Sequence, residues 1–320
     1  MKKSNKNRNF NDITAGFLSK AKEKTKKNAL TKAKLKESTY SRYSFLCEKH
    51  ILSYFENMEV SKINNECINK FINYKLKNGG LDGEPLSPKT VNDMVCLLLQ
   101  ILKPYRYFDM DIEKPSCRQK EVSIFTKKEY NKLKEYLSIG TDSKKLGIIV
   151  AMLTGIRIGE LCALKWEHID LENATISINN TIQRIKTNDA KGSKKTKIII
   201  DTPKSDMSIR SIPIPEILLA KLIKFKADNN SYILTNSPQY IEPRVYMRHF
   251  KECLQSCKIK DNNFHTLRHT FATMAIARGI DIKTVSVLLG HSDVAFTMKI
   301  YVHPDIEHRR VQIEKLAIGF

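Results

Sequence analysis

The sequence lacks any hydrophobic run long enough to cross a membrane. Its longest apolar stretches, such as Leu146 to Leu153, fall well short of the ~20 residues that a spanning helix needs. The basic N-terminus is not followed by an apolar segment of the kind found in secretory signals. We therefore expect a cytoplasmic protein with no membrane partner.

The seven cysteines are odd in number, scattered along the chain, and form no Cys-x-x-Cys pair. This pattern argues against a disulfide framework and is typical of reduced thiols in a reducing compartment. No cysteine stands in a context that predicts a nucleophile. The sequence also lacks an internal repeat.

Acidic residues are scarce relative to basic ones. The chain has 34 Asp and Glu against 55 Lys and Arg, which gives a formal net charge of +21 and a pI near 9.6. Such a balance indicates a polyanionic partner, and nucleic acid fits better than a membrane surface. The length of 320 residues allows two domains of ordinary size.

Residues 1–36 concentrate this positive charge, with twelve Lys or Arg, two acids and a net charge of +10. Like charges oppose one another in a free helix, so we predict a flexible basic N-terminal extension that closes on phosphates. A tail that only keeps the protein soluble is the alternative.

Residues 37–110 carry three amphipathic helical patterns and predict a small all-helical domain. The first pattern begins at Ser38, the second stops at Gly79-Gly80, and the third opens at Ser87-Pro88. Four basic residues of this domain are candidate phosphate contacts, with an ordinary solvated face as the alternative: Arg42, Lys75, Lys77 and Lys89.

Residues 111–122 predict a linker, and residues 123–320 predict a second domain that opens with a Thr126–Glu129 capping box. Helical patterns then give way to alternating, isoleucine-rich segments, which predict strands at 175–182, 197–202 and 208–214. We therefore expect a mainly α fold with a small antiparallel β-sheet, of the α+β class.

The stretch 264–301 carries the clearest chemistry. His265 and Arg268 lie three residues apart on a helical pattern and share one face. His291 follows Gly290, where a helix end can turn it back toward the first helix, and Tyr301 comes ten residues later. A His, an Arg, a second His and a Tyr are suited to holding a phosphate and attacking it with a phenol oxygen.

Two more cations join this set. Arg157 opens a helix after a Thr-Gly-Ile turn, between apolar segments where a lone guanidinium is costly to bury without an anion. Glu160, three residues on, can orient it. Lys204 stands at the tip of a tight turn between two predicted strands.

Metal chemistry is the main alternative for this region. Cys253, Cys257, His265 and His269 read C-x3-C-x7-H-x3-H, but seven residues are too few for the usual zinc-finger gap. A metalloprotease helix needs Glu directly after its first His, and Thr266 stands there instead. We therefore predict no metal and no bound cofactor.

The ordered motifs resemble those of the tyrosine recombinase (phage integrase) family. They are T-G-I-R-I-G-E-L, the turn lysine Lys204, H-T-L-R-H, L-G-H-S and the late Tyr301. The segments S-T-Y-S-R-Y and L-S-P-K-T-V-N are also similar to the family's helical core-binding domain, so the resemblance covers residues 38–303. Many mobile-element integrases add an N-terminal β-sheet domain that reads arm sites, and residues 1–36 have no strand pattern.

The resemblance implies a role for each of the six site residues. Arg157 and Arg268 clamp the scissile phosphate, Lys204 protonates the leaving 5′ oxygen, and His291 hydrogen-bonds the phosphate. His265 handles the proton of the nucleophile Tyr301, which forms a 3′-phosphotyrosine without ATP. The lysines near Lys204, such as Lys194, Lys195 and Lys197, leave its assignment open.

The resemblance also implies double-stranded DNA as the partner and a homo-tetramer assembled on two DNA sites. It predicts a recombinase, the integrase of a phage or transposon, which can use accessory DNA-bending or directionality factors. A Xer-like resolvase of chromosome or plasmid dimers is the runner-up, followed by a type IB topoisomerase and a non-catalytic DNA-binding regulator. Asp305–Phe320 predicts an amphipathic C-terminal helix whose apolar positions need a surface to bury against, either on its own domain or on a neighbouring protomer. In the recombinases that this chain resembles, a C-terminal segment packs into the next protomer around a ring, so we expect the neighbour.

Overall fold

The computed structural model describes residues 8–26, 35–80, 82–105, 112–117, 122–187, 195–203, 206–291, 293–301, 310 and 313–314. The chain divides into two compact units. The first comprises Met1–Lys120 with Arg184–Lys197, and the second comprises Glu121–Gln183 with Ile198–Phe320. No helix in the described ranges is long and apolar enough to cross a membrane.

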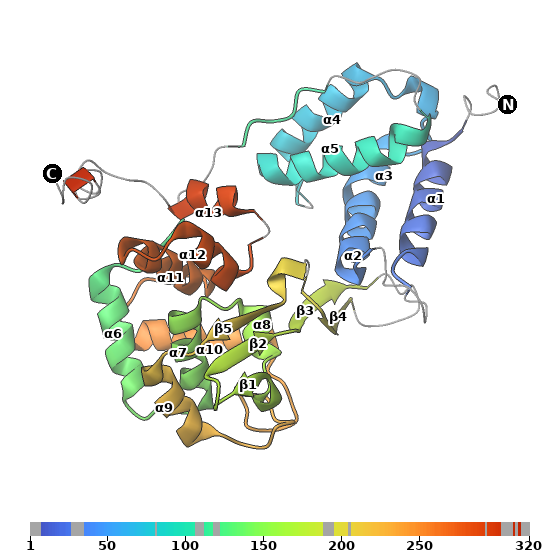
Figure 1. Ribbon diagram of the computed structural model, residues 1–320. Coiled ribbons are helices and arrows are strands. Elements are labelled where there is room, and N and C mark those ends of the chain that lie inside the picture. The colour runs from blue at the N-terminus through green and yellow to red at the C-terminus, as the bar shows by residue number, and fades with distance from the viewer. Residues whose placement is uncertain are drawn as a thin grey trace. The chain divides into compact units, whose positions relative to one another are not determined.

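The first unit is helical (Figure 1). Its helices are α1 (Phe10–Glu23), α2 (Glu37–Leu46), α3 (Leu52–Phe55), α4 (Asn65–Asn78) and α5 (Pro88–Leu102), with a π-helical turn at Cys47–Ile51 and 3-10 turns at Val60–Lys62 and Lys103–Tyr105. The predicted start of α5 is confirmed, because the Ser87 side chain accepts from the Thr90 N–H and Pro88 is the first helical residue. The predicted cap at Ser38 is wrong, since α2 already begins at Glu37 after Lys36.

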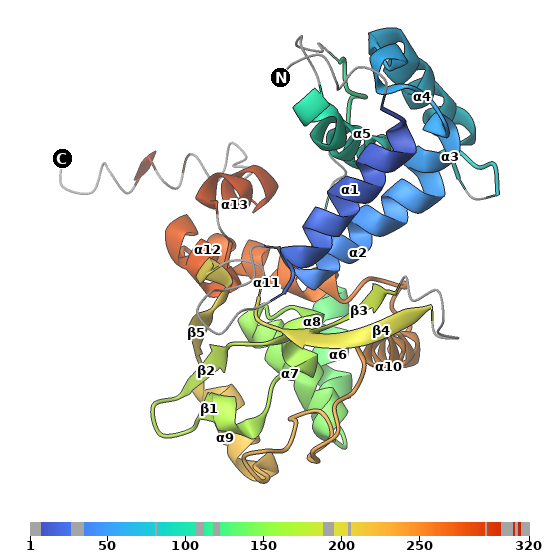
Figure 2. The same ribbon diagram turned by 90° about the vertical axis from the view of Figure 1, so that its right-hand side faces the viewer.

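Helix α1 differs from the flexible extension expected for residues 1–36. Phe10 and Ile13 are buried in the core of the first unit, and the Phe10 ring centroid lies 5.5 Å from that of Phe55. Figures 1 and 2 show α1 running alongside α2. The prediction relied on the high lysine count and overlooked apolar residues at helical spacing. The free energy gained by burying these residues outweighs the repulsion among the exposed lysines. Residues 1–7 and 27–34 lie outside the described residues.

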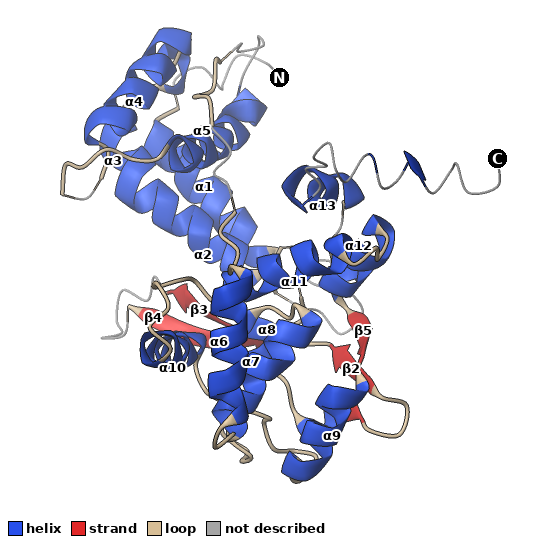
Figure 3. Cartoon of the chain, turned by 90° about the vertical axis from the view of Figure 1, so that its left-hand side faces the viewer, coloured by secondary structure: helices blue, strands red, loops and turns tan. Residues whose placement is uncertain are grey.

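The second unit places helices around a small sheet. Its helices are α6 (Lys127–Ser138), α7 (Ser143–Thr154), α8 (Ile158–Cys162), α9 (Glu216–Phe225), α10 (Pro243–Ser256), α11 (His265–Ala277), α12 (Ile282–Leu289) and α13 (Val294–Tyr301). Helix α7 is buried on most sides, because α6, α9 and α11 all pack against it (Figure 3). The predicted capping box of α6, Thr126 with Glu129, is confirmed.

The sheet has the strand order β1 (Ile169–Asp170), β2 (Thr175–Ile178) and β5 (Arg210–Pro213), with antiparallel pairing throughout. A second, two-stranded sheet joins β3 (Thr181–Lys186) to β4 (Thr196–Asp201). The segment predicted as one strand at 175–182 therefore belongs to two sheets, and it breaks at Asn179-Asn180, where asparagines favour a turn. The expected fold, mainly α with a small antiparallel sheet, is confirmed.

Candidate active site

Arg268 is the most deeply buried cation of the site, with 1% of its surface exposed on α11. Its two terminal nitrogens donate to the carbonyl oxygens of Gly155 (2.9 Å) and Leu289 (2.6 Å). These carbonyls lie at the C-terminal ends of α7 and α12, where the last carbonyl oxygens of a helix have no partner within the helix. Gly155 and Gly290 take the left-handed conformation at these ends. The Nε of Arg268 is buried and has no hydrogen-bond partner among the described residues. A buried, unsatisfied guanidinium N–H is suited to receive an anion.

Arg157 lies beside Arg268 and remains partly open to solvent. It is the N-cap residue of α8, and 32% of its side chain is exposed. One terminal nitrogen donates to Glu160 at 2.7 Å, and the other donates to the carbonyl oxygen of Gly290 at 3.2 Å. The prediction that Glu160 orients Arg157 is therefore confirmed. An incoming anion can reach the Arg157 guanidinium from solvent without displacing the buried guanidinium of Arg268.

Glu160 is a buried carboxylate shared by two guanidiniums. Besides Arg157, it accepts from Arg210 of β5 at 2.9 Å and 3.3 Å. Burial would raise the pKa of Glu160, but Arg210 and Arg157 more than offset this effect and lower it. The carboxylate therefore remains ionised at neutral pH and fixes both guanidiniums.

Arg210 was not singled out from the sequence. It also donates to the carbonyl oxygens of Leu288 (2.7 Å) and Ser208 (3.1 Å), so it ties β5 to the end of α12. The available signal was the alternation of β5, in which Arg210 shares the buried face with Ile212. An arginine at a position that alternation assigns to the interior needs a carboxylate partner, and here that partner is Glu160.

The pKa of Arg268 is lowered to about 9, chiefly by burial and then by the charges of Arg157 and Arg210. Arg268 is therefore still protonated at neutral pH. Of the side chains described above, Glu160 is the one carboxylate against three guanidiniums. The described site therefore carries excess positive charge, as a site for a phosphodiester requires.

The two predicted histidines lie at the edges of this cluster. His265 is the first residue of α11, and part of its surface remains exposed. Loss of water around the rest of the residue, followed by the charges of His269 and Arg268, lowers its pKa to about 4. His291 follows the Gly290 turn, and its Nδ1 lies 2.8 Å from the hydroxyl of Thr297. Burial and the nearby guanidiniums lower the pKa of His291 to about 3. Both rings are therefore neutral at pH 7.

Tyr301 ends α13 and is 7% exposed. Its hydroxyl lies 2.6 Å from Nδ1 of His269, a residue that the sequence had suggested only as part of the rejected zinc pattern. The signal that could have drawn attention to it is its position four residues after His265, on the same face of α11. Burial raises the pKa of Tyr301, while Arg268 and Arg157 act in the opposite direction.

Lys204 lies outside the described residues, between β4 and the 3-10 turn Asp206–Ser208. Of the lysines that left its assignment open, Lys194 is likewise outside the described residues. Lys197 forms an ion pair with Glu37 within the first unit. The general acid of the site therefore stays a prediction.

The four candidate DNA contacts of the first unit differ in exposure. Lys77 and Lys89 are exposed, and Arg42 is exposed but paired with Asp93. Lys75 is 4% exposed, with its ammonium 5.2 Å from the ring centroid of Tyr74, and burial lowers its pKa. The assignment of Lys75 to a phosphate-contacting surface is therefore wrong, because its apolar stem and amine are both taken into the core.

The residues of the rejected zinc pattern serve other contacts. Cys253 is buried on α10 with its sulfur 3.7 Å from Nε2 of His249, and burial raises its pKa to about 11. His269 is engaged by Tyr301. Within the described ranges, no three His, Cys, Asp or Glu side chains gather as metal ligands would.

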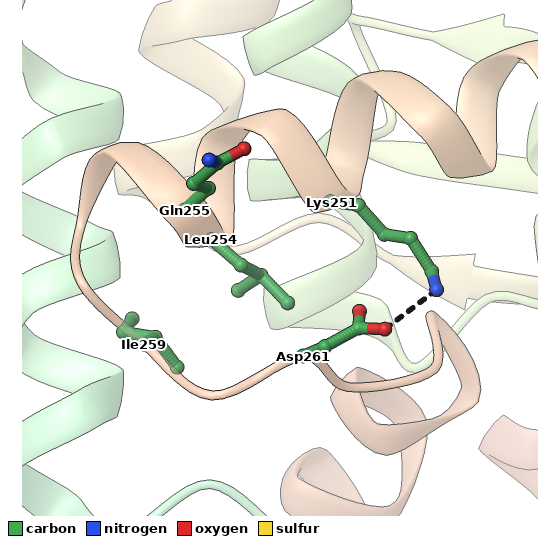
Figure 4. Close-up of a pocket in the computed structure, with 5 residues that line it drawn as sticks. All are labelled: Lys251, Leu254, Gln255, Ile259 and Asp261. Atoms are coloured by element: carbon green, nitrogen blue, oxygen red, sulfur yellow. Dashed lines mark hydrogen bonds and ion pairs between the residues drawn. The ribbon is translucent and has the colours of Figure 1, made fainter.

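A pocket lies at the C-terminal end of α10 (Figure 4), and none of the site residues lines it. It is lined by Lys251, Leu254, Gln255, Ile259 and Asp261. The Lys251 ammonium and the Asp261 carboxylate form an ion pair of 2.7 Å at this pocket. Neither a guanidinium nor an imidazole lines it, so it does not share the chemistry of the site.

Comparison with known proteins gives two family matches. The profile of the phage integrase family matches residues 123–308, and the profile of the phage integrase N-terminal SAM-like domain matches residues 29–76. The first match alone spans more than half of the chain and includes all six predicted catalytic residues.

Individual relatives extend over most of the chain. A XerC-like tyrosine recombinase of Caldanaerobacter subterraneus subsp. tengcongensis is 29% identical over 97% of this chain and 84% of its own length. The ICEBs1 integrase of Bacillus subtilis is 24% identical over 88% of this chain and 78% of its own. Among solved structures, the Tn1549 transposon integrase in complex with transposon right end DNA superposes with a TM-score of 0.70. That structure is 18% identical and covers 97% of this chain and 100% of the other, a likeness of fold.

Proposed function

The chain belongs to the phage integrase family of tyrosine recombinases, and from this premise we propose that it cuts and rejoins DNA strands at specific sites through a 3′-phosphotyrosine intermediate. The observation that carries the proposal is the convergence of Arg157, Arg268 and Tyr301. They come from the start of α8, from α11 and from the end of α13. Arg157 and Arg268 donate to the adjacent carbonyl oxygens of Gly290 and Leu289, and the Tyr301 hydroxyl contacts His269, the residue that follows Arg268. Two fixed cations beside a protonated phenol fit an attack on a phosphodiester.

Each side chain has a role in the proposed reaction. Arg268 and Arg157 bind the nonbridging oxygens of the scissile phosphate, and the unpartnered Nε of Arg268 supplies one donor. The neutral His291 hydrogen-bonds the same phosphate. The Tyr301 oxygen attacks phosphorus, its proton passes to the neighbouring histidines, and Lys204 protonates the leaving 5′ oxygen.

The products are a 3′-phosphotyrosine and a free 5′ hydroxyl. The phosphotyrosine retains the energy of the broken phosphodiester, so a 5′ hydroxyl from another strand can reverse the step without ATP. Recombination of two duplexes requires cleavage of four strands. One Tyr301 per protomer therefore favours a homo-tetramer on two DNA sites.

We assign duplex binding to the first unit, with Arg42, Lys77 and Lys89 as phosphate contacts. The C-terminal segment Asp305–Phe320 lies mostly outside the described residues, but Ile313 is 65% exposed. The helical spacing of Val311, Ile313 and Leu316 in the sequence favours burial of this segment against a neighbouring protomer, as its exchange around a ring requires. Because the substrate is DNA, the proposed location is the cytoplasm.

Integration of a mobile element is the role we favour, supported by the match to the ICEBs1 integrase over most of both chains. Resolution of chromosome or plasmid dimers is the second candidate, favoured by the XerC-like relative. Both roles use the same strand chemistry. The two roles differ in where the DNA is cut and in the accessory DNA-bending or directionality factors that act with the protein.

The test is to trap the protein on host DNA with a denaturant and to sequence the DNA that stays covalently linked. We expect Tyr301→Phe to bind DNA as the wild type does and to form no covalent complex, since it lacks only the nucleophilic oxygen. Cut sites at the ends of a mobile element support an integrase, and cut sites at a dimer-resolution locus support the Xer-like role. Covalent linkage that persists in Tyr301→Phe rules out Tyr301 as the nucleophile.

A further inference from the structure

We propose that His269 is a catalytic residue and the immediate acceptor of the Tyr301 proton when the tyrosine oxygen attacks the phosphate. The inference rests on the proposed function and assigns to a particular ring the proton transfer that family resemblance gives to His265. The geometry of α11 and α13 carries it.

The contact between the two side chains is short and direct. The Tyr301 hydroxyl lies 2.6 Å from His269 Nδ1, and the ring centroids are 5.6 Å apart. Among the described residues, no hydrogen bond joins Tyr301 to His265. The His265 ring instead stands edge-on to that of His269, at 4.7 Å between centroids. His269 is therefore the histidine in position to receive the proton first, and the exposed His265 lies next to it.

The protonation states suit a transfer in this direction. Burial and the adjacent Arg268 lower the pKa of His269, so its ring is neutral at pH 7 and has a nitrogen free to accept. Burial raises the pKa of Tyr301, so the phenol oxygen holds its proton at rest. Among the described residues, the charged and titratable groups that the contacts place around His269 are Arg268 and His265 on its own helix and Tyr301 on α13.

Binding of the phosphodiester would promote the transfer. A negative charge held by Arg268 offsets the repulsion that disfavours a protonated His269, and so raises the basicity of the ring when the substrate is in place. The attack then breaks the Tyr301 O–H bond, with the proton moving to His269 Nδ1, and forms the bond from oxygen to phosphorus. The bond from phosphorus to the 5′ oxygen breaks, and that oxygen takes a proton from the general acid.

The reverse step uses the same groups. A free 5′ hydroxyl attacks the phosphotyrosine, the bond between phosphorus and the Tyr301 oxygen breaks, and His269 returns its proton to that oxygen. The imidazolium therefore exists only while the enzyme is covalently attached to DNA. The proton count is the same before cleavage and after religation.

The decisive variant is His269→Asn, because an asparagine oxygen can occupy the place of Nδ1 and accept the hydrogen bond without taking the proton. The probe is a nicked duplex carrying the cut site mapped as described above, made with either oxygen or sulfur at the 5′ bridging position. We expect single-turnover covalent attachment to slow by about 10²- to 10⁴-fold with both leaving groups. In contrast, the attachment rate of Lys204→Ala should be low with the oxygen leaving group and largely restored with the sulfur leaving group. A thiolate departs without needing a proton from a general acid.

The matched control is His249→Asn, a partly buried histidine on α10 whose ring contacts Cys253, Glu252 and Tyr246 and none of the site residues named above. It should attach to the duplex at the wild-type rate. His269→Ala serves as the second variant, and added imidazole should restore part of its rate if the ring acts by taking a proton. Binding of the uncleaved duplex is measured for each protein, since a folding defect would weaken binding.

The outcomes separate the two proposals. A wild-type rate for His269→Asn, restoration of that variant by the sulfur leaving group, or no imidazole rescue of His269→Ala each overturns the role of His269 and leaves the recombinase intact. If the wild-type protein forms no covalent complex with host DNA, so that no cut site can be mapped, the proposed function is overturned and this inference with it.

Discussion

Glu160 pairs with two guanidiniums, that of Arg157, which is partly buried, and that of Arg210, which is fully buried. We predict that Glu160→Gln lowers the free energy of unfolding by about 3–5 kcal/mol, because it leaves buried positive charge without its counter-ion. Urea denaturation followed by circular dichroism measures the change.

The control for this loss is Asp261→Asn. It removes the exposed ion pair with Lys251, whose side chains are 65% and 49% exposed. An exposed pair should cost at most about 1 kcal/mol, since water screens the charges in both states. If both substitutions lowered the free energy of unfolding equally, the burial of Glu160 would contribute nothing to its effect on stability.

The histidines of the site make stability depend on pH. In the unfolded chain their pKa is near 6.5, whereas in the folded protein it falls to about 4 for His265 and about 3 for His291. Between these values the unfolded state binds more protons, so the free energy of unfolding should fall as the pH is lowered from about 6.5 to about 4 for His265 and on to about 3 for His291. Glu160, whose folded pKa is lowered, adds a further loss below its ordinary pKa.

The measurement is the urea midpoint as a function of pH for the wild type and for His291→Asn. The variant should show a shallower decline between about pH 6.5 and 3, with a difference in slope of at most ~1.4 kcal/mol per pH unit for one proton. Its behaviour below that window should match the wild type, where Glu160 dominates. Identical slopes across the window would contradict a buried, neutral His291.

At the scale of elements, the ends of α7 and α12 build the site. Gly155 takes a φ of 65°, and its carbonyl accepts from Arg268. A Cβ at Gly155 would meet the Phe271 ring at 2.7 Å, which no real Cβ contact tolerates. We predict that Gly155→Ala lowers stability and weakens DNA cleavage together, because the carbonyl that holds Arg268 must move.

Gly279 provides the matched control for this helix end. It has a φ of 87° after α11, but a Cβ there would meet nothing within 4 Å. Gly279→Ala should cost about 1 kcal/mol from backbone strain alone. Gly155→Ala should cost a further ~1–3 kcal/mol from the clash, as measured by urea denaturation. Equal losses would mean that the end of α7 relaxes freely around the site.

At the scale of the whole molecule, the net charge of +21 predicts a strong dependence of DNA affinity on salt. Because α1 is part of a folded core, deletion of residues 1–36 would disturb more than charge. The sharper change is to replace Lys20, Lys22 and Lys24 by alanine, since all three are exposed. We expect weaker binding to all sequences alike, with the slope of log affinity against log salt reduced by about 1 per lost phosphate contact.

The same charge change on α6, at Lys128, Lys132 and Lys134, is the control, since these lysines are also exposed. Fluorescence anisotropy over a range of salt concentrations compares the two triple variants. If both lower the slope equally, net charge alone explains the effect. A loss confined to one DNA sequence would instead show that α1 reads bases.

The sequence by itself determined the order of the chemical groups and most of the local structure. The capping box at Thr126, the proline start of α5 and the glycine ends of α7 and α12 follow from the conformational preferences of single residues. The pairing of Arg157 with Glu160 was predictable because residues three apart meet on one helical turn. Such features depend on near neighbours, which the sequence lists directly.

Only the tertiary structure decided which distant groups meet. Tyr301 and His269 are 32 residues apart, and Arg210 and Glu160 are 50 apart. Their contacts therefore depend on how α13 packs on α11 and on how Arg210 of β5 reaches Glu160 of α8. Composition also misjudged Lys75 and the segment around Phe10, because charge counts do not say which side of a helix meets a core. Burial is a property of the assembled surfaces, and the same lysine or histidine is solvated, structural or catalytic according to what the rest of the fold places beside it.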